Sequence, residues 1–236
     1  MAGITNSEFL NKVIPYGFDV ATLGGYSLDA PTIEASKKII ARGRKEFDFH
    51  LDEIFSHIES EVASIKKIHS DVKVSANVRA TTPQPIIEVG KIKDLDIVEI
   101  NCHCRQNEIL DIGCGQEMLK RQDLGDFISQ VVDHVDCEVS VKIRANVDGV
   151  NTLDIAHIID DAGADYLHVD AMKKGVFDAD YNLLREICNN VKIKVIGNNS
   201  VNSISNTQKM IETGVNGFSI ARGVISGNLD FDISNF

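Results

Sequence analysis

One short segment carries most of the side chains that could do chemistry. Cys102, His103, Cys104 and Arg105 stand in a row directly after Asn101. A thiol close to a cation readily exchanges a proton, and a histidine and an arginine flank Cys104. Its place at the end of an apolar run also sets this thiol apart from cysteines that are simply buried. We therefore predict that Cys104 is an acid/base or nucleophilic residue, with His103 and Arg105 beside the substrate.

The same segment contains side chains of the types that bind zinc, namely Cys102, His103, Cys104 and Cys114. Adjacent residues of an extended segment point in opposite directions, so three neighbours rarely face one ion. The spacing also lacks the short cysteine pairs that are typical of zinc sites. We therefore predict no metal in this chain.

Polar side chains also end the other apolar, β-branched runs. Lys142 ends one of them, and a lysine among amides suits a planar, hydrogen-bonding cofactor that takes up negative charge. The remaining run ends carry Asn77 and Arg79, Asn101, Arg144, His168 and Asp170, Asn198 and Asn199, and Arg222.

The elements that must position these residues are read from an alternation of apolar runs and amphipathic stretches. This pattern is typical of βα units and a parallel sheet. Eight such units in 236 residues predict an α/β fold, a (β/α)8 TIM barrel forming a single domain over residues 1–236. The predicted strands are 18–23, 45–50, 72–78, 96–101, 138–143, 165–170, 192–197 and 217–221. The predicted helices are 30–43, 51–69, part of 116–135, 151–163, 179–190 and 203–214, with a short one after Pro85.

In such a barrel the site lies at the carboxyl ends of the strands, which is where these polar residues stand. The last two strands end in IGNNS (196–200) and IARG (220–223). Paired turns at these strands commonly hold a phosphate through backbone N–H groups, although glycine and asparagine also serve ordinary turns. We therefore predict that these turns bind the phosphate of a cofactor or substrate.

Charge and composition bear on partners and location. The net charge is −11 and the pI is about 5.0, whereas proteins that grip polyanions usually present a basic face. The sequence has no long apolar run and no secretory signal at its start. Its five cysteines are an odd number, which suits a reducing compartment better than a disulfide framework. We expect a cytoplasmic protein without a membrane partner.

Five segments of the chain resemble those of a known family. VEINCHC (98–104) is similar to a motif of the tRNA-dihydrouridine synthases, in which an acidic residue and an asparagine precede a cysteine. VSVKIRANVD (139–148) resembles that family's VKxR stretch, and IKVIGNNS (193–200) its PVIxNGD segment. GFSIARG (217–223) resembles its VMIGRG turn, and VSANVRATTPQ (74–84) its V-x-V-Q-L-x-G segment.

The likeness runs in order from roughly residue 70 to 228, and VATLGGYSLDAPT (20–32) is a looser match to the family's opening segment. It implies an FMN-binding barrel related to dihydroorotate dehydrogenases. Only fifteen residues follow the last predicted strand, so the chain looks like a compact archaeal-type branch without the C-terminal domain that helps to hold tRNA. Together with the acidic net charge, this favours a small-molecule substrate over tRNA. The protein could also act as a homo-oligomer or together with a partner subunit.

The resemblance also implies roles for single residues. Cys104 falls on the family's catalytic cysteine, and Lys142 on the lysine beside the flavin N1 and O2. Asn101 matches an asparagine beside flavin and substrate, and Asn77 replaces a glutamine that bonds the flavin's pyrimidine edge. The remaining matches are Asp170, Asn198, Ala221 and Arg222 toward the cofactor, and Arg144 toward the substrate.

The chain departs from the family pattern at several of these positions. His103 stands in place of a glycine, Arg105 in place of a proline and Asp170 in place of a histidine. Asn199 and Ser200 replace the glycine and aspartate of the phosphate turn. These changes predict a differently shaped cysteine loop and a tighter phosphate turn.

Three functions are consistent with these observations. The first is an FMN-dependent oxidoreductase, dihydrouridine synthase-like, that transfers hydride at a C=C or C–C bond of a pyrimidine-like or other small substrate. The second is a barrel without flavin that acts as a lyase, isomerase or synthase on a phosphorylated metabolite, with Lys142 as base or electrophile. The third is a barrel that binds a ligand without catalysis.

Overall fold

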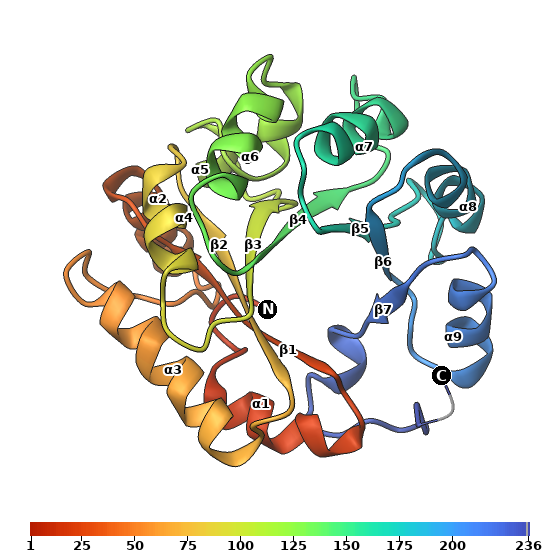
Figure 1. Ribbon diagram of the computed structural model, residues 1–236, viewed down its shortest axis with the longest axis horizontal. Coiled ribbons are helices and arrows are strands. Elements are labelled where there is room, and N and C mark those ends of the chain that lie inside the picture. Colours follow the sequence, from red (N-terminus) through yellow and green to blue (C-terminus); the bar gives the residue numbers. More distant parts are fainter. Residues whose placement is uncertain (235) are drawn as a thin grey trace.

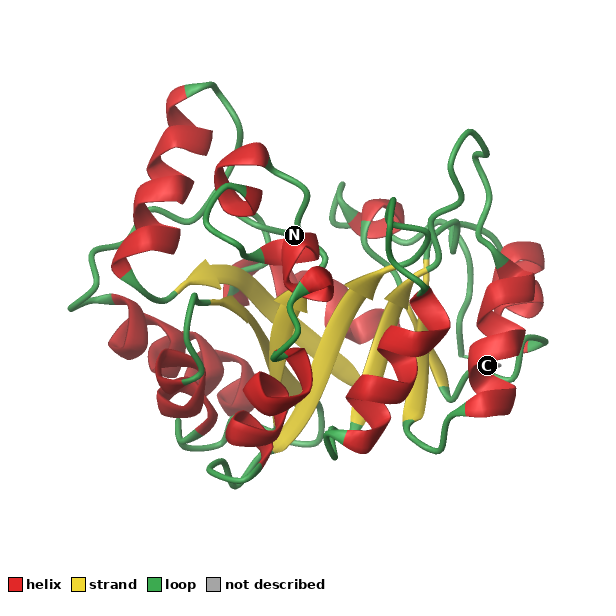
Figure 2. Ribbon diagram, turned by 90° about the horizontal axis from the view of Figure 1, so that it is seen from above, coloured by secondary structure: helices red, strands yellow, loops and turns green. Residues whose placement is uncertain are grey.

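The computed structural model describes residues 1–234 and 236 of the chain. At its centre, parallel strands curl around a common axis and the helices lie outside them (Figure 1). Each strand pairs with the next one along the chain, so all carboxyl ends lie on one side of the molecule (Figure 2). Within these residues the strands are β1 (Val20–Ser27), β2 (Lys73–Arg79), β3 (Ile97–Cys102), β4 (Glu138–Arg144), β5 (Tyr166–Asp170), β6 (Lys194–Asn198) and β7 (Gly217–Ser219).

The helices between the strands are amphipathic. In α3, for example, Ile54, Ile58, Val62 and Ile65 recur at the spacing of one helix face, and all four are buried. None of the described helices is long and apolar enough to cross a lipid bilayer. The α-helices are α1 (Ser7–Val13), α2 (Ala30–Ala41), α3 (Ile54–Ile68), α4 (Gln84–Gly90), α5 (Asn107–Leu110), α6 (Leu124–Val132), α7 (Thr152–Asp161), α8 (Tyr181–Asn190) and α9 (Ile204–Ile211), and the 3-10 helices are η1 (Ile14–Tyr16), η2 (Gly115–Lys120) and η3 (Arg222–Val224).

The prediction of an eight-stranded barrel requires a correction. The α/β fold and the curled parallel sheet are confirmed, but the described residues contribute seven strands to it. The segment 45–50, predicted as a strand, is a loop, and β1 pairs directly with β2. The edge strands β1 and β7 are not hydrogen-bonded to each other in the described sheet. The fold is therefore a TIM-barrel-like sheet that does not close through strand pairing.

The loop at 45–50 shows why its sequence resembles a strand. Its alternating apolar residues, Phe47 and Phe49, pack on the buried ring of Tyr26, with ring centroids 4.7 and 6.5 Å away. Phe49 also lies 4.0 Å from the ring of His57 in α3. Glu46, which directly precedes Phe47 in this loop, forms an ion pair with the buried Arg79. Side-chain packing thus produces the period of two without any ladder of backbone hydrogen bonds.

The first residues of the chain lie along the free edge of β1. Thr5 forms an isolated antiparallel bridge with Gly24, and its backbone carbonyl accepts the N–H of Gly24 at 3.0 Å. The amino group of Met1 lies within 3.2 Å of the Gly24 carbonyl oxygen, close to the centre of the curl in Figure 1. This segment therefore occupies part of the space between the two edge strands.

Capping interactions hold the loops at the carboxyl ends of the strands. Asp29 caps α2, accepting the backbone N–H of Thr32 at 3.1 Å. Its other carboxylate oxygen accepts the backbone N–H and the hydroxyl of Thr81, both at 2.6 Å. One side chain therefore ties the end of β1 to the end of β2.

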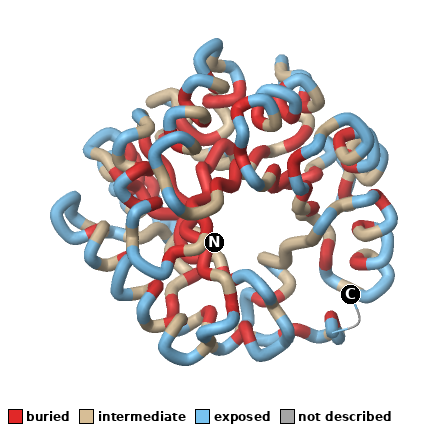
Figure 3. Tube along the Cα trace, in the orientation of Figure 1, coloured by how far each residue is buried: buried red, intermediate tan, exposed pale blue. Residues whose placement is uncertain are grey.

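The apolar core surrounds the sheet. Most residues of β1 to β6 and the inner sides of the helices are buried, β7 is half-buried, and the outer sides of the helices are exposed (Figure 3). Buried polar residues gather instead at the carboxyl half of the sheet, where Asn77, Arg79, Glu99, Asn101 and His168 are nearly inaccessible to solvent. Because buried polar groups are costly unless they are hydrogen-bonded, this region is where a functional site is to be sought.

Candidate active site

The polar side chains at the strand ends lie in layers inside the curl of the sheet. Paired residues on neighbouring parallel strands point to the same side. Asn101 of β3 is level with Lys142 of β4, which is level with His168 of β5. Two residues further along, Arg144 is level with Asp170. The register thus brings side chains from three strands to one mouth.

The lower layer is organised by the carboxylate of Glu99. One of its oxygens accepts the amide N–H of Asn77 at 2.8 Å. The other contacts the Ser140 hydroxyl at 3.1 Å and Nδ1 of His168 at 2.7 Å. The far nitrogen of His168 reaches the hydroxyl of Ser219 in β7 at 2.7 Å. This network joins β2, β3, β4, β5 and β7 across the interior.

The charge state of this network follows from its contacts. Burial alone would raise the pKa of the Glu99 carboxyl, but contact with His168 and the charge of Lys142 hold that pKa well below its usual range. Burial, followed by the charge of Lys142, lowers the pKa of His168. At neutral pH the pair is therefore an ionised carboxylate that accepts a hydrogen bond from a neutral imidazole.

Lys142 is the cation at the centre of the mouth. It is half-buried between Asn101 and His168 in the register of the sheet. Its ammonium group forms no hydrogen bond or ion pair with residues 1–234 or 236, and its charge acts on Glu99 and on both nearby histidines. A half-buried donor without a protein partner is suited to bind an anionic ligand atom.

Asn101 fixes the loop that carries Cys104. Its side-chain oxygen accepts the backbone N–H groups of His103 at 3.1 Å and of Cys104 at 2.9 Å. Its amide nitrogen donates to the side-chain oxygen of Asn77 at 2.8 Å. On the far side, the Cys104 carbonyl accepts the backbone N–H of Gln116 at 2.9 Å. The cysteine is thus held from the sheet and from η2.

The close approach at this point requires a glycine. Gly115 has a φ of +60°, and a Cβ built on it would lie 2.3 Å from the Cys104 carbonyl oxygen. We expect Gly115→Ala to lower the free energy of unfolding by about 1–3 kcal/mol and to slow turnover, because the Cys104 backbone must move. Chemical denaturation and steady-state kinetics measure the two effects.

Gly113→Ala is the matched control for that substitution. Gly113 also has a positive φ, +73°, but a Cβ built there meets no atom within 4 Å. It should therefore show the conformational cost, about 1 kcal/mol, without the kinetic loss. Equal kinetic losses in both variants would show that the contact with Cys104 is unimportant.

The five thiols of the chain differ sharply in their surroundings. Cys102 and Cys114 are fully buried, and burial raises the pKa of each to about 12. Burial also raises the pKa of Cys137 to about 11. Cys104 is half-buried, and its sulfur lies 3.7 Å from Nη1 of Arg79. Among these thiols, Cys104 therefore has the surroundings of a reactive one.

Two departures from the family pattern contact each other. Nε2 of His103 lies 2.6 Å from Oδ2 of Asp170, which is also 3.1 Å from Nη1 of Arg144. The second oxygen of Asp170 accepts the amide N–H of Asn199 at 2.7 Å. His103 and Arg144 are themselves 2.8 Å apart. The carboxylate of Asp170 is therefore neutralised by protein groups.

This cluster is expected to make the fold less stable in acid. Burial lowers the pKa of His103 to about 4, below its ordinary 6.5. Burial alone would raise the pKa of Asp170, but His103 and Arg144 hold it well below its usual range. Between pH 6.5 and 4 the unfolded chain binds more protons than the folded one, so the free energy of unfolding falls as pH falls.

The measurement is urea denaturation across that pH range, with His103→Gln for comparison. Removing the imidazole should flatten the slope, which one proton limits to about 1.4 kcal/mol per pH unit. The same slope in both proteins would show that other groups govern acid stability.

The turn after β6 keeps a left-handed backbone without glycine. Asn199 and Ser200 have φ angles of 99° and 58°. The amide of Asn198 donates to the backbone carbonyl and to the hydroxyl of Ser219, at 2.9 and 2.8 Å. Asparagine tolerates this conformation better than most residues, and backbone strain of this kind at a strand end is typical of functional turns.

Three guanidinium groups beyond or at the strand ends act on one another through their charges. Burial lowers the pKa of Arg144, and the charges of Arg105 and Arg222 lower it further. Arg105 and Arg222 are exposed, whereas Arg144 is mostly buried. The Nε of Arg144 is buried and has no hydrogen-bond partner among the described residues. β7 ends at Ser219, and Ala221 and Arg222 come shortly after it, where η3 begins.

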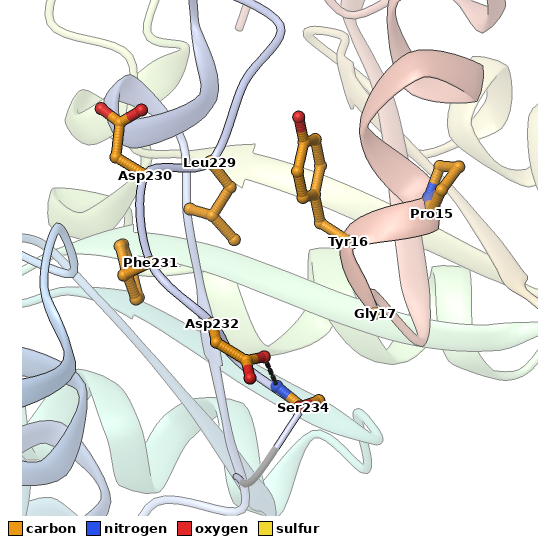
Figure 4. Close-up of a pocket in the computed structure, with 8 residues that line it drawn as sticks. All are labelled: Pro15, Tyr16, Gly17, Leu229, Asp230, Phe231, Asp232 and Ser234. Atoms are coloured by element: carbon orange, nitrogen blue, oxygen red, sulfur yellow. Dashed lines mark hydrogen bonds between the residues drawn. The ribbon is translucent and has the colours of Figure 1, made fainter.

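The described residues offer neither a metal-binding group nor a distinct surface pocket at these side chains. The described residues contain no group of three His, Cys, Asp or Glu side chains that could hold a metal. The clearest surface pocket is formed by Pro15, Tyr16 and Gly17 together with Leu229 to Asp232 and Ser234 (Figure 4). It lies before the start of β1, away from the candidate residues, and we assign it no role.

Sequence reasoning did not include three side chains in the candidate site. Glu99 was present only as the acidic residue of a motif, and Arg79 only as a polar residue at a strand end. Glu46 was assigned to a strand, so its pairing with Arg79 was missed. The charges of Glu46 and Arg79 in otherwise apolar segments could have indicated their pairing, because charged residues are rarely buried without a partner.

The family was identified by comparison with known proteins. The family model of dihydrouridine synthases (Dus) matches residues 50–227. The chain belongs to the dihydrouridine synthase family. It is thereby a member of a family of FMN-dependent oxidoreductases, as predicted from its motifs. An uncharacterized protein of Methanocaldococcus jannaschii is 35% identical over 98% of this chain and 89% of its own length.

Other relatives in the family are longer. A tRNA-dihydrouridine synthase B of Shewanella oneidensis is 27% identical over 94% of this chain, which spans 65% of that protein. The corresponding enzyme of Proteus vulgaris is 24% identical over 70% of this chain and 54% of its own length. The chain thus spans between about half and two thirds of these two relatives.

Solved structures support the same fold. FabK from Thermotoga maritima superimposes with a TM-score of 0.57 at 12% identity, over 92% of this chain and 54% of the other. A putative lyase/mutase from Burkholderia cenocepacia gives a TM-score of 0.59 at 14% identity, over 92% and 75%. At these identities the likeness shows the fold alone.

Proposed function

We propose that this protein is an FMN-dependent oxidoreductase that transfers hydride at a C=C or C–C bond of a pyrimidine-like ring, with Cys104 as acid/base. The observation that carries the proposal is the joint placement of Cys104 and Lys142. Asn101 binds the Cys104 backbone through its oxygen and is level with Lys142 on the next strand. A proton donor and a cation at one mouth are what hydride transfer to a conjugated ring requires.

The residues present fit FMN. Lys142 is a half-buried donor without a partner among residues 1–234 and 236, and it would bind the edge of the flavin ring that becomes negative on reduction. The amide of Asn77 donates to Glu99 and that of Asn101 donates to Asn77, so each amide nitrogen keeps a second N–H for a ligand. The phosphate would lie at the turns of β6 and β7, near Asn198, Ala221 and Arg222. Asp170, whose charge is neutralised by its neighbours, would face the ribityl group that links the flavin ring to the phosphate.

When bound, FMN would supply or accept the hydride. The protein's own contribution is to move the proton, hold the ring and balance the charge. Cys104 would give a proton to one ring carbon, or take it in the reverse direction. Lys142 would stabilise negative charge, and His103, Arg105 and Arg144 would orient the substrate.

For the substrate we propose a small anionic pyrimidine. The net charge of −11 disfavours a polyanion, whereas Arg105, Arg144 and Arg222 offer a local site for one phosphate or carboxylate. tRNA is the competing substrate, since relatives of this chain are named as tRNA-dihydrouridine synthases.

A reoxidation assay tests this proposal. The protein loaded with FMN is reduced without oxygen and then mixed with uracil, uridine monophosphate, orotate or unmodified tRNA. We expect a free pyrimidine to reoxidise the flavin. Reoxidation by tRNA alone would overturn the proposal of a small-molecule substrate. If no compound reoxidised the flavin, and no dihydropyrimidine reduced it in the reverse assay, the pyrimidine assignment would be overturned.

A further inference from the structure

A buried arginine lies directly behind the candidate catalytic thiol. The Arg79 side chain is 2% exposed, and its partner Glu46 is 5% exposed. Nη1 of Arg79 points to the sulfur of Cys104 at 3.7 Å, within hydrogen-bond distance for sulfur. The two residues come from different segments, since Arg79 is the last residue of β2 and Cys104 lies in the loop after β3.

The guanidinium is fixed in place by the surrounding side chains. Its Nε donates to the Ser27 hydroxyl and its Nη2 to the Ser36 hydroxyl, each at 3.2 Å. Nη2 also pairs with the carboxylate of Glu46. The two serine hydroxyls are hydrogen-bonded to each other at 2.8 Å. Since Nε and Nη2 are engaged in this way, Nη1 is the guanidinium nitrogen that contacts the thiol.

Stability alone is a weak reason for this arrangement. A buried ion pair loses its hydration, and a well-packed apolar pair of similar volume often serves folding equally well. The pair does, however, place a rigid cation beside a sulfur that must carry charge. When Cys104 gives its proton to a substrate carbon, the S–H bond breaks and its electron pair stays on sulfur. The thiolate later takes a proton from water.

We propose that Arg79 is a positioning residue for Cys104, which orients the thiol and stabilises the negative charge on its sulfur, while Glu46 holds and partly neutralises the guanidinium. The inference deepens the proposed function and rests on it for the role of the thiol. Its physical basis is the attraction between opposite charges in a site of low dielectric constant.

The test is the alkylation of Cys104 by iodoacetamide between about pH 6 and 10, since only the thiolate reacts. It needs neither flavin nor substrate, so a colourless protein would leave it valid. Digestion and mass spectrometry report each cysteine separately. Cys137, which precedes β4, and Cys188, in α8, are half-buried and serve as references in the same tube. The charged or titratable groups that face Cys104 are Arg79, Arg144 and Cys114, with Glu46 behind Arg79.

Two variants give opposite expectations. Glu46→Gln keeps the guanidinium but removes the carboxylate charge, so Cys104 should react faster at a given pH. Arg79→Met combined with Glu46→Gln removes both charges without leaving one buried alone. Cys104 should then react roughly tenfold more slowly at neutral pH, and its profile should move to higher pH.

Each outcome decides for or against the inference. An unchanged Cys104 profile in the double variant, with unchanged reference cysteines, would show that Arg79 has no influence on the sulfur. If the double variant unfolds, the reference cysteines will react faster as well. Glu46→Gln alone then decides, and slower or unchanged alkylation of Cys104 in that variant would overturn the proposal. Arg79→Lys, which keeps the charge, should largely retain the wild-type profile.

Discussion

Cys104→Ala is expected to leave flavin binding intact and to lower substrate-dependent reoxidation of the flavin at least about a hundredfold. The reason is that this thiol transfers the proton in the proposed function, whereas the hydrogen-bond partner of its sulfur among the described residues is Arg79, which is not proposed to hold FMN. Anaerobic stopped-flow absorbance measures reoxidation, and the flavin spectrum of the same sample measures binding.

Cys137→Ala is the control for that substitution, because Cys137 is also partly exposed but lies before β4, at the opposite end of the sheet. It should retain the wild-type rate. If Cys104→Ala turned over at the wild-type rate, the catalytic cysteine would have been assigned wrongly. If it lost the flavin instead, Cys104 would be part of the cofactor site.

Glu99→Ala is expected to give the largest loss of stability, about 3–5 kcal/mol in the free energy of unfolding. The substitution leaves His168, Asn77 and Ser140 without their shared acceptor in a region closed to water. The network spans the interior of the sheet, so a local repair by water is difficult. Urea denaturation, monitored by circular dichroism, gives the value.

Glu138→Ala provides the comparison on the same sheet. Glu138 also pairs with a cation, Lys73, and accepts from the hydroxyl of Tyr166, but its side chain is 30% exposed. Water replaces the lost partner there, and the cost should stay below about 1 kcal/mol. Similar losses in the two variants would contradict the view that burial makes the Glu99 network important.

Much of the fold could be predicted because apolar runs and helical periodicity report burial directly. The runs that became β2 to β6 each lie within a residue or two of the predicted ranges. The run at 45–50 failed because alternating Phe47 and Phe49 record contact with Tyr26, and contact alone does not distinguish a strand from an extended loop. Period-two patterning is therefore necessary for a strand on a half-buried sheet but insufficient.

The candidate site divides in the same way. That Asn101, Lys142 and Asp170 would meet followed from parallel strands ending on one side. The contact between His103 and Asp170, and the burial of Arg79 with Glu46, depend on loop conformations that join positions far apart in the sequence. No local pattern encodes such pairs, so the structure was needed to find them.

The central claim is that this barrel-like sheet binds FMN at the mouth around Lys142. The most direct measurement is an absorbance spectrum of the purified protein after incubation with FMN and gel filtration, with Lys142→Met measured in parallel. We predict a flavin band at about 450 nm that elutes with the wild-type protein and is weakened in the variant. A folded wild-type protein that stays colourless after reconstitution would contradict the claim and favour a barrel that acts on a phosphorylated metabolite without flavin.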